Sequence, residues 1–152
     1  IALIRDGRLG EIKKATCVIN GGPTSPQLPV VEAPKHLDWN LWQGPVPHKP
    51  YRFLAGENGE TKSWSRSHYE FRWWYEYSGG KMTDWGAHHN DIAQWGNGTE
   101  RSGPVEIDGK SLSALKPGGF TAAATYRIDM KYANGVTMTI VDGSTGTTMV
   151  SA

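Results

Sequence analysis

The sequence predicts one β-rich α+β domain with a few helices and long loops. Three features indicate this fold class: an alternating, β-branched segment near the N-terminus, a pair of alternating segments joined by Asn134-Gly135, and one short helical segment rich in histidine. The 152 residues fit a single domain, to which we assign residues 1–152. A chain of this length can bury a sizeable core.

The first twenty residues are expected to run from the end of a helix through a turn into a strand. Residues 1–6 resemble the last turn of a helix that begins upstream, and Gly7 is its stop signal. Residues 11–20 alternate and are rich in β-branched side chains, which favours a strand. Cys17 lies in this run and is expected to be buried. As the single cysteine it excludes an intramolecular disulfide and favours a cytoplasmic compartment.

The next forty residues are expected to be loop around one helical turn. Residues 21–34 hold four prolines and two glycines, which excludes regular structure. Asp38 is the expected N-cap of a turn over residues 38–42, which Gly44 ends. Residues 46–59 again predict loop, and the aromatic residues in and before this segment argue against disorder.

An aromatic belt follows over residues 64–77. Its odd-numbered aromatic positions alternate as in a strand, although a short helix from Arg72 fits nearly as well. The belt has two interpretations: it is the core between sheet and helix, or it lines a site where sugar rings stack.

A short helix is predicted over residues 84–95, DWGAHHNDIAQW, after a Gly-Gly pair and before Gly96-Asn97-Gly98. Spacings of four, three and four place four side chains on one face: Asp84, His88, Asp91 and Trp95.

The first pair on that face has two interpretations. Asp84 and His88, one turn apart, suit a general acid/base pair. Alternatively, Asp84 or Thr83 is an N-cap and His88 is a hydrogen-bonded core histidine, which spacing alone favours. His89 points about a third of a turn away from His88, toward solvent or an interface.

The C-terminal third is expected to complete the sheet. A strand is predicted to start near residues 104–107, and residues 120–131 and 136–142 are the clearest strands in the chain. Tyr132-Ala133-Asn134-Gly135 between them is a strong hairpin signal.

Charge and motifs exclude several function classes. Sixteen basic and fifteen acidic residues give a net charge of +1, so nothing favours nucleic acid or an anionic membrane as a partner. No apolar run is long enough to span a bilayer. The sequence has no HExxH, and adjacent histidines on a helix cannot easily share one ion, so we expect no metal site. It also has no GxGxxG, GxxxxGK[ST] or GxSxG motif, and we assign no cofactor-binding residue.

Several segments together resemble the C-terminal domain of the glucose–fructose oxidoreductase and inositol dehydrogenase family, Gfo/Idh/MocA. They are GRLGEIKKA, DWNLWQGPVPHKPY, FRWWYEYSGGKMTDWGAHHNDIAQW and YRIDMKYANGVTMTI, in that order. The resemblance implies an open, mostly antiparallel sheet with a few helices on one face, incomplete after the hairpin. It also implies a Rossmann domain that is absent from this chain.

The resemblance assigns roles to particular residues. Gly80 to Trp95 is similar to the family's DxGxHxxD helix, so Asp84 and His88 become the expected catalytic pair. With that helix beside the belt, substrate contacts are expected from five residues: Arg72, Trp73, Trp74, Tyr75 and His89.

The function implied is a substrate-binding and oligomerisation domain of an oxidoreductase. It would act on a sugar or polyol hydroxyl with NAD or NADP, which the missing Rossmann domain of the parent protein would hold. The fragment alone is expected to be inactive, and the parent to be a homo-oligomer through the sheet face. Two alternatives stay open: a non-enzymatic sugar-binding or assembly module, and a glycosidase that oxidises its substrate transiently.

Overall fold

The computed structural model describes residues 1–56 and 63–143. The expectation that the family's sheet ends early concerns residues 144–152 and lies outside this range. In chain order the elements are α1 (Ala2–Arg5), β1 (Lys14–Val18), α2 (Trp39–Gln43), β2 (Phe53–Leu54), β3 (Trp64–Ser65), the 3-10 helix η1 (His68–Trp73), α3 (Lys81–Asp84), α4 (Gly86–Gly96), β4 (Glu106–Ser111), β5 (Tyr126–Lys131) and β6 (Thr137–Val141).

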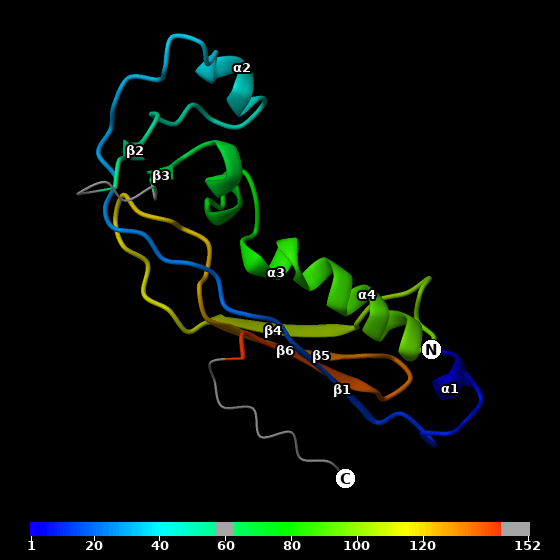
Figure 1. The fold of residues 1–152 in the computed structure, drawn as a ribbon. Helices are drawn as coiled ribbons and strands as arrows, with labels where there is room; N and C mark the ends of the chain where they lie inside the picture. The colour runs from blue at the N-terminus through cyan, green and yellow to red at the C-terminus, as the bar shows by residue number, and fades with distance from the viewer. Residues whose placement is uncertain (57–62, 144–152) are drawn as a thin grey trace.

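Four strands form one sheet in the order β1-β6-β5-β4. The pairs β4–β5 and β5–β6 are antiparallel, and only β1 runs parallel to its neighbour β6. Helices α3 and α4 lie along one face of this sheet (Figure 1). The predicted fold class, α+β with a mostly antiparallel sheet and few helices, is confirmed.

The main core fills the space between the sheet and these helices. Alternation along each strand sends one set of side chains to the helices, and the buried members are Cys17, Ile19, Tyr126, Tyr132, Met138 and Ile140. Met82 and Ala93 pack against this set from α3 and α4. Full burial of an aliphatic side chain such as Ile140 contributes about 2 kcal/mol. Cys17 is buried, as expected, and burial raises the pKa of its thiol.

The strands follow the predicted segments with shorter bounds. β1 and β6 fall inside the ranges expected for them, and the Asn134-Gly135 turn joins β5 to β6 with a positive φ of 86° at Gly135. β5 starts at Tyr126, six residues later than expected, because residues 120–125 bond to other segments instead. The Thr121 and Ala122 amides both donate to the Trp73 carbonyl, at 2.9 Å.

A second packed unit contains the loops and the aromatic belt. It holds α2, the small antiparallel pair β2–β3 and η1, and its core consists of Leu28, Trp73, Trp74 and Phe120. Asp38 caps α2 as predicted, accepting from the Leu41 amide at 3.0 Å. Two expectations are wrong here. Residues 53–54, expected to be loop, form β2. The belt forms β3 and η1, which is neither one long strand nor the alternative short helix from Arg72, because η1 begins at His68 and ends at Trp73.

The histidine-rich helix starts earlier than predicted and has a break. Gly80, with φ of 69°, is the N-cap of α3, and Trp85 separates α3 from α4. Asp84 is therefore the last residue of α3, and the N-cap role considered for Asp84 or Thr83 is wrong. Thr83 instead closes the first turn, since its Oγ1 accepts from the Gly79 amide at 3.0 Å and donates to the Gly80 carbonyl at 3.2 Å.

Candidate active site

Asp84 is held by an arginine from the aromatic belt. Arg72 Nη1 lies 3.2 Å from both Asp84 Oδ1 and Asp84 Oδ2. The two side chains are 19% and 21% exposed, so solvent screens this ion pair less than a pair on the open surface. The contact links η1 to the end of α3 and fixes the position of the carboxylate.

The guanidinium of Arg72 is itself fixed by Tyr69, one turn earlier in η1. Its Cζ lies 3.5 Å from the centroid of the Tyr69 ring, and its Nε donates to the Tyr69 carbonyl at 3.1 Å. The centroid of the Trp73 ring lies 5.1 Å from the same Cζ. An arginine stacked and bonded in this way loses little further freedom when it pairs with a carboxylate.

His88 lies one helical turn beyond Asp84, and its side chain is exposed. Within the part of the chain that the structure describes, its imidazole makes no hydrogen bond, including none to Asp84. His89 is half-buried, and its Nδ1 lies 2.9 Å from the Trp85 carbonyl. The structure therefore gives Asp84 a fixed partner and leaves the His88 ring open to a ligand.

The face of α4 that carries His88 points away from the sheet. The sheet-facing side is marked by Gly86, where an added Cβ would lie 3.2 Å from Ile19 Cδ1. On the other side, three large side chains are about half exposed: Trp85 at 53%, Ile92 at 57% and Trp95 at 46%. An exposed apolar strip beside an acid and an imidazole is typical of a surface that another domain or a ligand covers.

The three aromatic belt residues expected to bind substrate lie in different environments. Trp73 is 5% exposed and Trp74 is fully buried, so both rings pack in the second core. Trp74 also donates from Nε1 to the Ser65 carbonyl at 3.0 Å, and its ring centroid lies 4.2 Å from Arg66 Cζ. Tyr75 is 55% exposed, so of these three rings only that of Tyr75 is open to a ligand.

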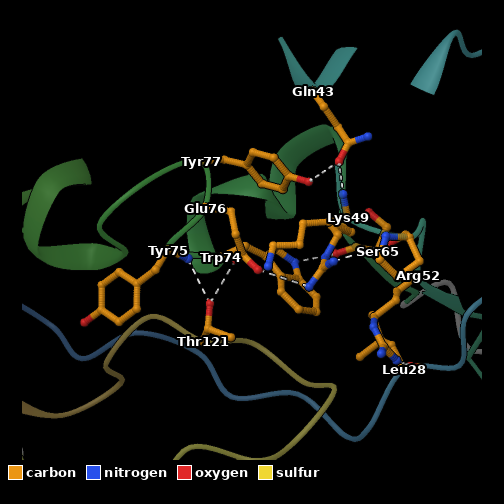
Figure 2. A network of polar contacts seen from close by, with 12 residues as sticks. Leu28, Gln43, Lys49, Arg52, Ser65, Trp74, Tyr75, Glu76, Tyr77 and Thr121 are labelled. Carbon is orange, nitrogen blue, oxygen red and sulfur yellow. Dashed lines mark hydrogen bonds and ion pairs between the residues drawn. The ribbon is translucent and has the colours of Figure 1, made fainter. Parts of the chain in front are cut away.

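A polar network holds the belt in place (Figure 2). Thr121 Oγ1 accepts from the Tyr75 amide at 2.8 Å and donates to Glu76 Oε2 at 3.4 Å. Glu76 in turn pairs with Arg66 at 3.4 Å, and burial lowers the pKa of Arg66. The Tyr77 hydroxyl donates to the Gln43 side chain at 3.3 Å, and burial raises the pKa of this phenol.

Sequence reasoning missed Tyr69 and Thr121 as supports of the site. Tyr69 is one aromatic residue among seven in the belt, and its role depends on η1, whose 3-10 geometry places it under Arg72. Thr121 lies 46 positions from Tyr75, and no local pattern signals that contact.

Two absences hold for the described residues. They contain no group of three or more His, Cys, Asp or Glu side chains placed to hold a metal ion. Across residues 1–56 and 63–143, no helix has the length and apolarity needed to cross a bilayer.

Comparison with known proteins gives one match. The sequence model of the Gfo/Idh/MocA oxidoreductase family, C-terminal alpha/beta domain, matches residues 22–150. No curated protein and no solved structure matches the chain.

Proposed function

Because this chain belongs to the Gfo/Idh/MocA oxidoreductase family through its C-terminal α/β domain, we propose that it is the substrate-binding domain of an NAD(P)-dependent oxidoreductase that acts on a sugar or polyol hydroxyl. The observation that carries the proposal is a carboxylate held in place four residues before an imidazole that is open to a ligand. Asp84 is held by Arg72 at 3.2 Å, and exposed His88 follows one turn later.

In this proposal His88 accepts the proton of the substrate hydroxyl as that carbon is oxidised. A neutral imidazole is the side chain best suited to taking a proton near neutral pH. Asp84 orients the hydroxyl or the imidazole, and Arg72 keeps the carboxylate in place. Bound nicotinamide would supply the hydride acceptor.

Arg72, Tyr75 and His89 are the proposed contacts to the rest of the substrate. Trp73 and Trp74 are buried in the core of the second unit. The dinucleotide site itself does not fit this chain. Its sequence lacks the Gly-rich strand–turn–helix unit that holds a pyrophosphate. We therefore propose that this site lies in a Rossmann domain of the parent protein. We also propose that the parent is cytoplasmic, and we treat residues 1–152 as one domain.

The sheet face opposite α4 is the proposed contact between copies of the parent. It presents Lys14, Asp129 and Thr137 around a shallow hollow of about 560 Å³. This face carries ion pairs and hydroxyl groups, and Thr139 Oγ1 donates to Asp129 at 2.8 Å. Such groups suit a polar interface between the same face of two copies.

The substitution His88→Ala in the parent protein tests the proposal. We expect turnover to fall by about 10²–10⁴-fold, the usual contribution of a general base, with sugar binding retained. His36→Ala, at an exposed histidine outside the site, is the matched control and should leave turnover unchanged. Unchanged turnover in His88→Ala would contradict the proposed role of His88. A parent protein that binds sugar but oxidises none would favour the non-enzymatic module, and hydrolysis of a glycoside without release of reduced nicotinamide would favour the glycosidase.

A further inference from the structure

We propose that a cavity beside the Arg72–Asp84 pair binds a second sugar ring, so that the preferred substrate is a glycoside of at least two rings. This inference rests on the proposed function, because it extends the same site. It starts from a hollow of about 450 Å³ whose walls include Pro34, Tyr51, Phe53, His68, Tyr69 and Glu70.

The cavity adjoins the candidate active site through one side chain. Tyr69 is 71% exposed and lines the cavity. The same ring carries the Arg72 guanidinium at 3.5 Å, and that guanidinium lies 3.2 Å from Asp84. A ligand that fills the cavity is therefore separated from the Asp84 carboxylate by the Tyr69 ring and the Arg72 guanidinium. In the proposal, a molecule of two linked rings lies across this separation along the surface.

His68 at the cavity wall has a backbone conformation that its residue type disfavours. Its φ is 50°, the only positive value outside glycine among the described residues. Such a conformation costs about 1 kcal/mol or more for a residue with a Cβ. Strained residues of this kind cluster at ligand sites, which makes His68 a candidate ligand contact.

A buried hydroxyl sets which nitrogen of His68 faces a ligand. Ser67 is fully buried, and its Oγ lies 2.9 Å from His68 Nδ1. A buried hydroxyl must donate its proton, and Nδ1 is the one acceptor it reaches among the described residues. With Ser67 Oγ as the donor and Nδ1 as the acceptor, the neutral imidazole carries its proton on Nε2, which is left to donate to an oxygen of the ligand.

The walls fit a hydroxylated ring. Phe53 and Tyr69 offer aromatic surface for the apolar face of a sugar, whereas Tyr51 in the same wall is buried. His68 offers a donor for a hydroxyl or ring oxygen. Glu70 is a carboxylate in the same wall, and it accepts from the Ser65 amide.

The test measures sugar binding to this chain by NMR, with maltose, cellobiose and glucose as probes. We expect at least one disaccharide to bind roughly tenfold more tightly than glucose, the gain from one well-placed hydrogen bond and added contact. That disaccharide should shift the signals of His68 and Tyr69 in addition to those of Asp84 and His88.

Two variants separate a ligand role from a structural one. His68→Gly relieves the strained φ, so we expect a higher midpoint of thermal unfolding together with loss of the disaccharide preference. Ser67→Ala removes the partner that sets the imidazole tautomer and should weaken the same preference in a folded chain, while His36→Gly should leave the preference unchanged.

Three results would overturn the second site. One is equal affinity for all three sugars, and another is a full disaccharide preference in His68→Gly. The third is that glucose and the disaccharides shift the NMR signals of Asp84 and His88 but not those of His68. This result would overturn the second site and leave the proposed function unaffected. Failure of the proposed function is read separately, from unchanged turnover of His88→Ala in the parent.

Discussion

Arg72 is the residue on which the geometry of the candidate site depends most. Its guanidinium stacks on Tyr69 and pairs with Asp84, and both partners of the ion pair are about 80% buried. Arg72→Met keeps a chain of similar length but leaves the carboxylate without its counter-charge. We expect a loss of about 1–2 kcal/mol in the free energy of unfolding, measured by urea denaturation.

The matched control for Arg72 is Arg127. It also forms a two-atom contact with an aspartate, Asp129, at 2.7 and 2.8 Å, but on the exposed sheet face. Arg127→Met should cost clearly less than Arg72→Met. Equal losses from the two substitutions would mean that burial adds nothing to the Arg72–Asp84 pair.

Tyr126 gives a prediction on stability at neutral pH. Its hydroxyl is buried and has no hydrogen-bond partner among the described residues. Because an unsatisfied buried hydroxyl costs free energy, Tyr126→Phe should be as stable as the wild type or up to about 1 kcal/mol more stable at neutral pH. A loss of stability in Tyr126→Phe would instead indicate a partner for the hydroxyl.

The same residue contributes to alkaline denaturation. Burial, and then the nearby Asp142 carboxylate, raise the pKa of Tyr126 to about 12. An unfolded tyrosine titrates at about 10, so between these values the unfolded state has lost a proton that the folded state keeps. Stability is therefore full below pH of about 10 and falls as the pH rises toward 12. In denaturation curves measured across that pH range, the stability of Tyr126→Phe should therefore fall less than that of the wild type.

At the scale of elements, the start of α3 depends on Gly80. Its φ is 69°, and an added Cβ would lie 2.7 Å from the Cβ of Ala122. Gly80→Ala therefore combines backbone strain with a clash and should cost about 2–3 kcal/mol. The free energy of unfolding from chemical denaturation measures this.

Gly135 is the control for that substitution. It has a φ of 86° in the hairpin, but a Cβ added there would meet nothing within 4 Å. Gly135→Ala should therefore cost only the backbone strain, about 1 kcal/mol. If both alanines cost the same, the packing of α3 on Ala122 is not as tight as the structure indicates.

The elements that sequence reasoning located best are those set by local signals. Asn134-Gly135 fixes a hairpin turn, and Asp38 with Gly44 bounds α2, since caps and turns need only neighbouring residues. The aromatic belt is ambiguous in sequence because its period-two pattern competes with long-range contacts. Thr121 and Ala122 bond to the Trp73 carbonyl, and these contacts end η1 in a way that no nearby residue signals.

The candidate site likewise has one feature that the sequence predicts and one that it does not. The spacing of Asp84 and His88 is readable from the sequence, because four residues span about one turn. The partner of Asp84 is not, since Arg72 is twelve positions away across the Gly79-Gly80 turn. Spacing therefore only places the two groups one turn apart, the family resemblance makes them the expected reacting pair, and the fold identifies what holds the carboxylate.

At the scale of the whole molecule, this chain alone should not oxidise a substrate. It contains the proposed proton acceptor but no motif that binds a dinucleotide. We expect no reduction of NAD or NADP when this chain is incubated with a panel of sugars and polyols. Turnover, or dinucleotide binding tighter than millimolar, would contradict the proposal that the dinucleotide site lies outside this chain.

The proposed assembly can be tested through the sheet face. Thr16 is exposed in the middle of the edge strand β1 on that face, in register with Thr139. Thr16→Arg places a bulky charge there and should shift the parent toward the monomer in light scattering. Ser102→Arg, in the exposed loop after α4, is the control, and an unchanged oligomer in both variants would rule out this face as the contact.

The central claim is that the His88 imidazole takes the substrate proton, with the Asp84 carboxylate held in place by Arg72. The most direct measurement is chemical rescue of His88→Gly in the parent protein, with kcat recorded as imidazole is added. We predict a large loss of kcat that added imidazole partly restores, and no effect of imidazole on the wild type. A His88→Gly variant that turns over like the wild type, or that imidazole cannot restore while it still folds and binds sugar, would contradict the claim.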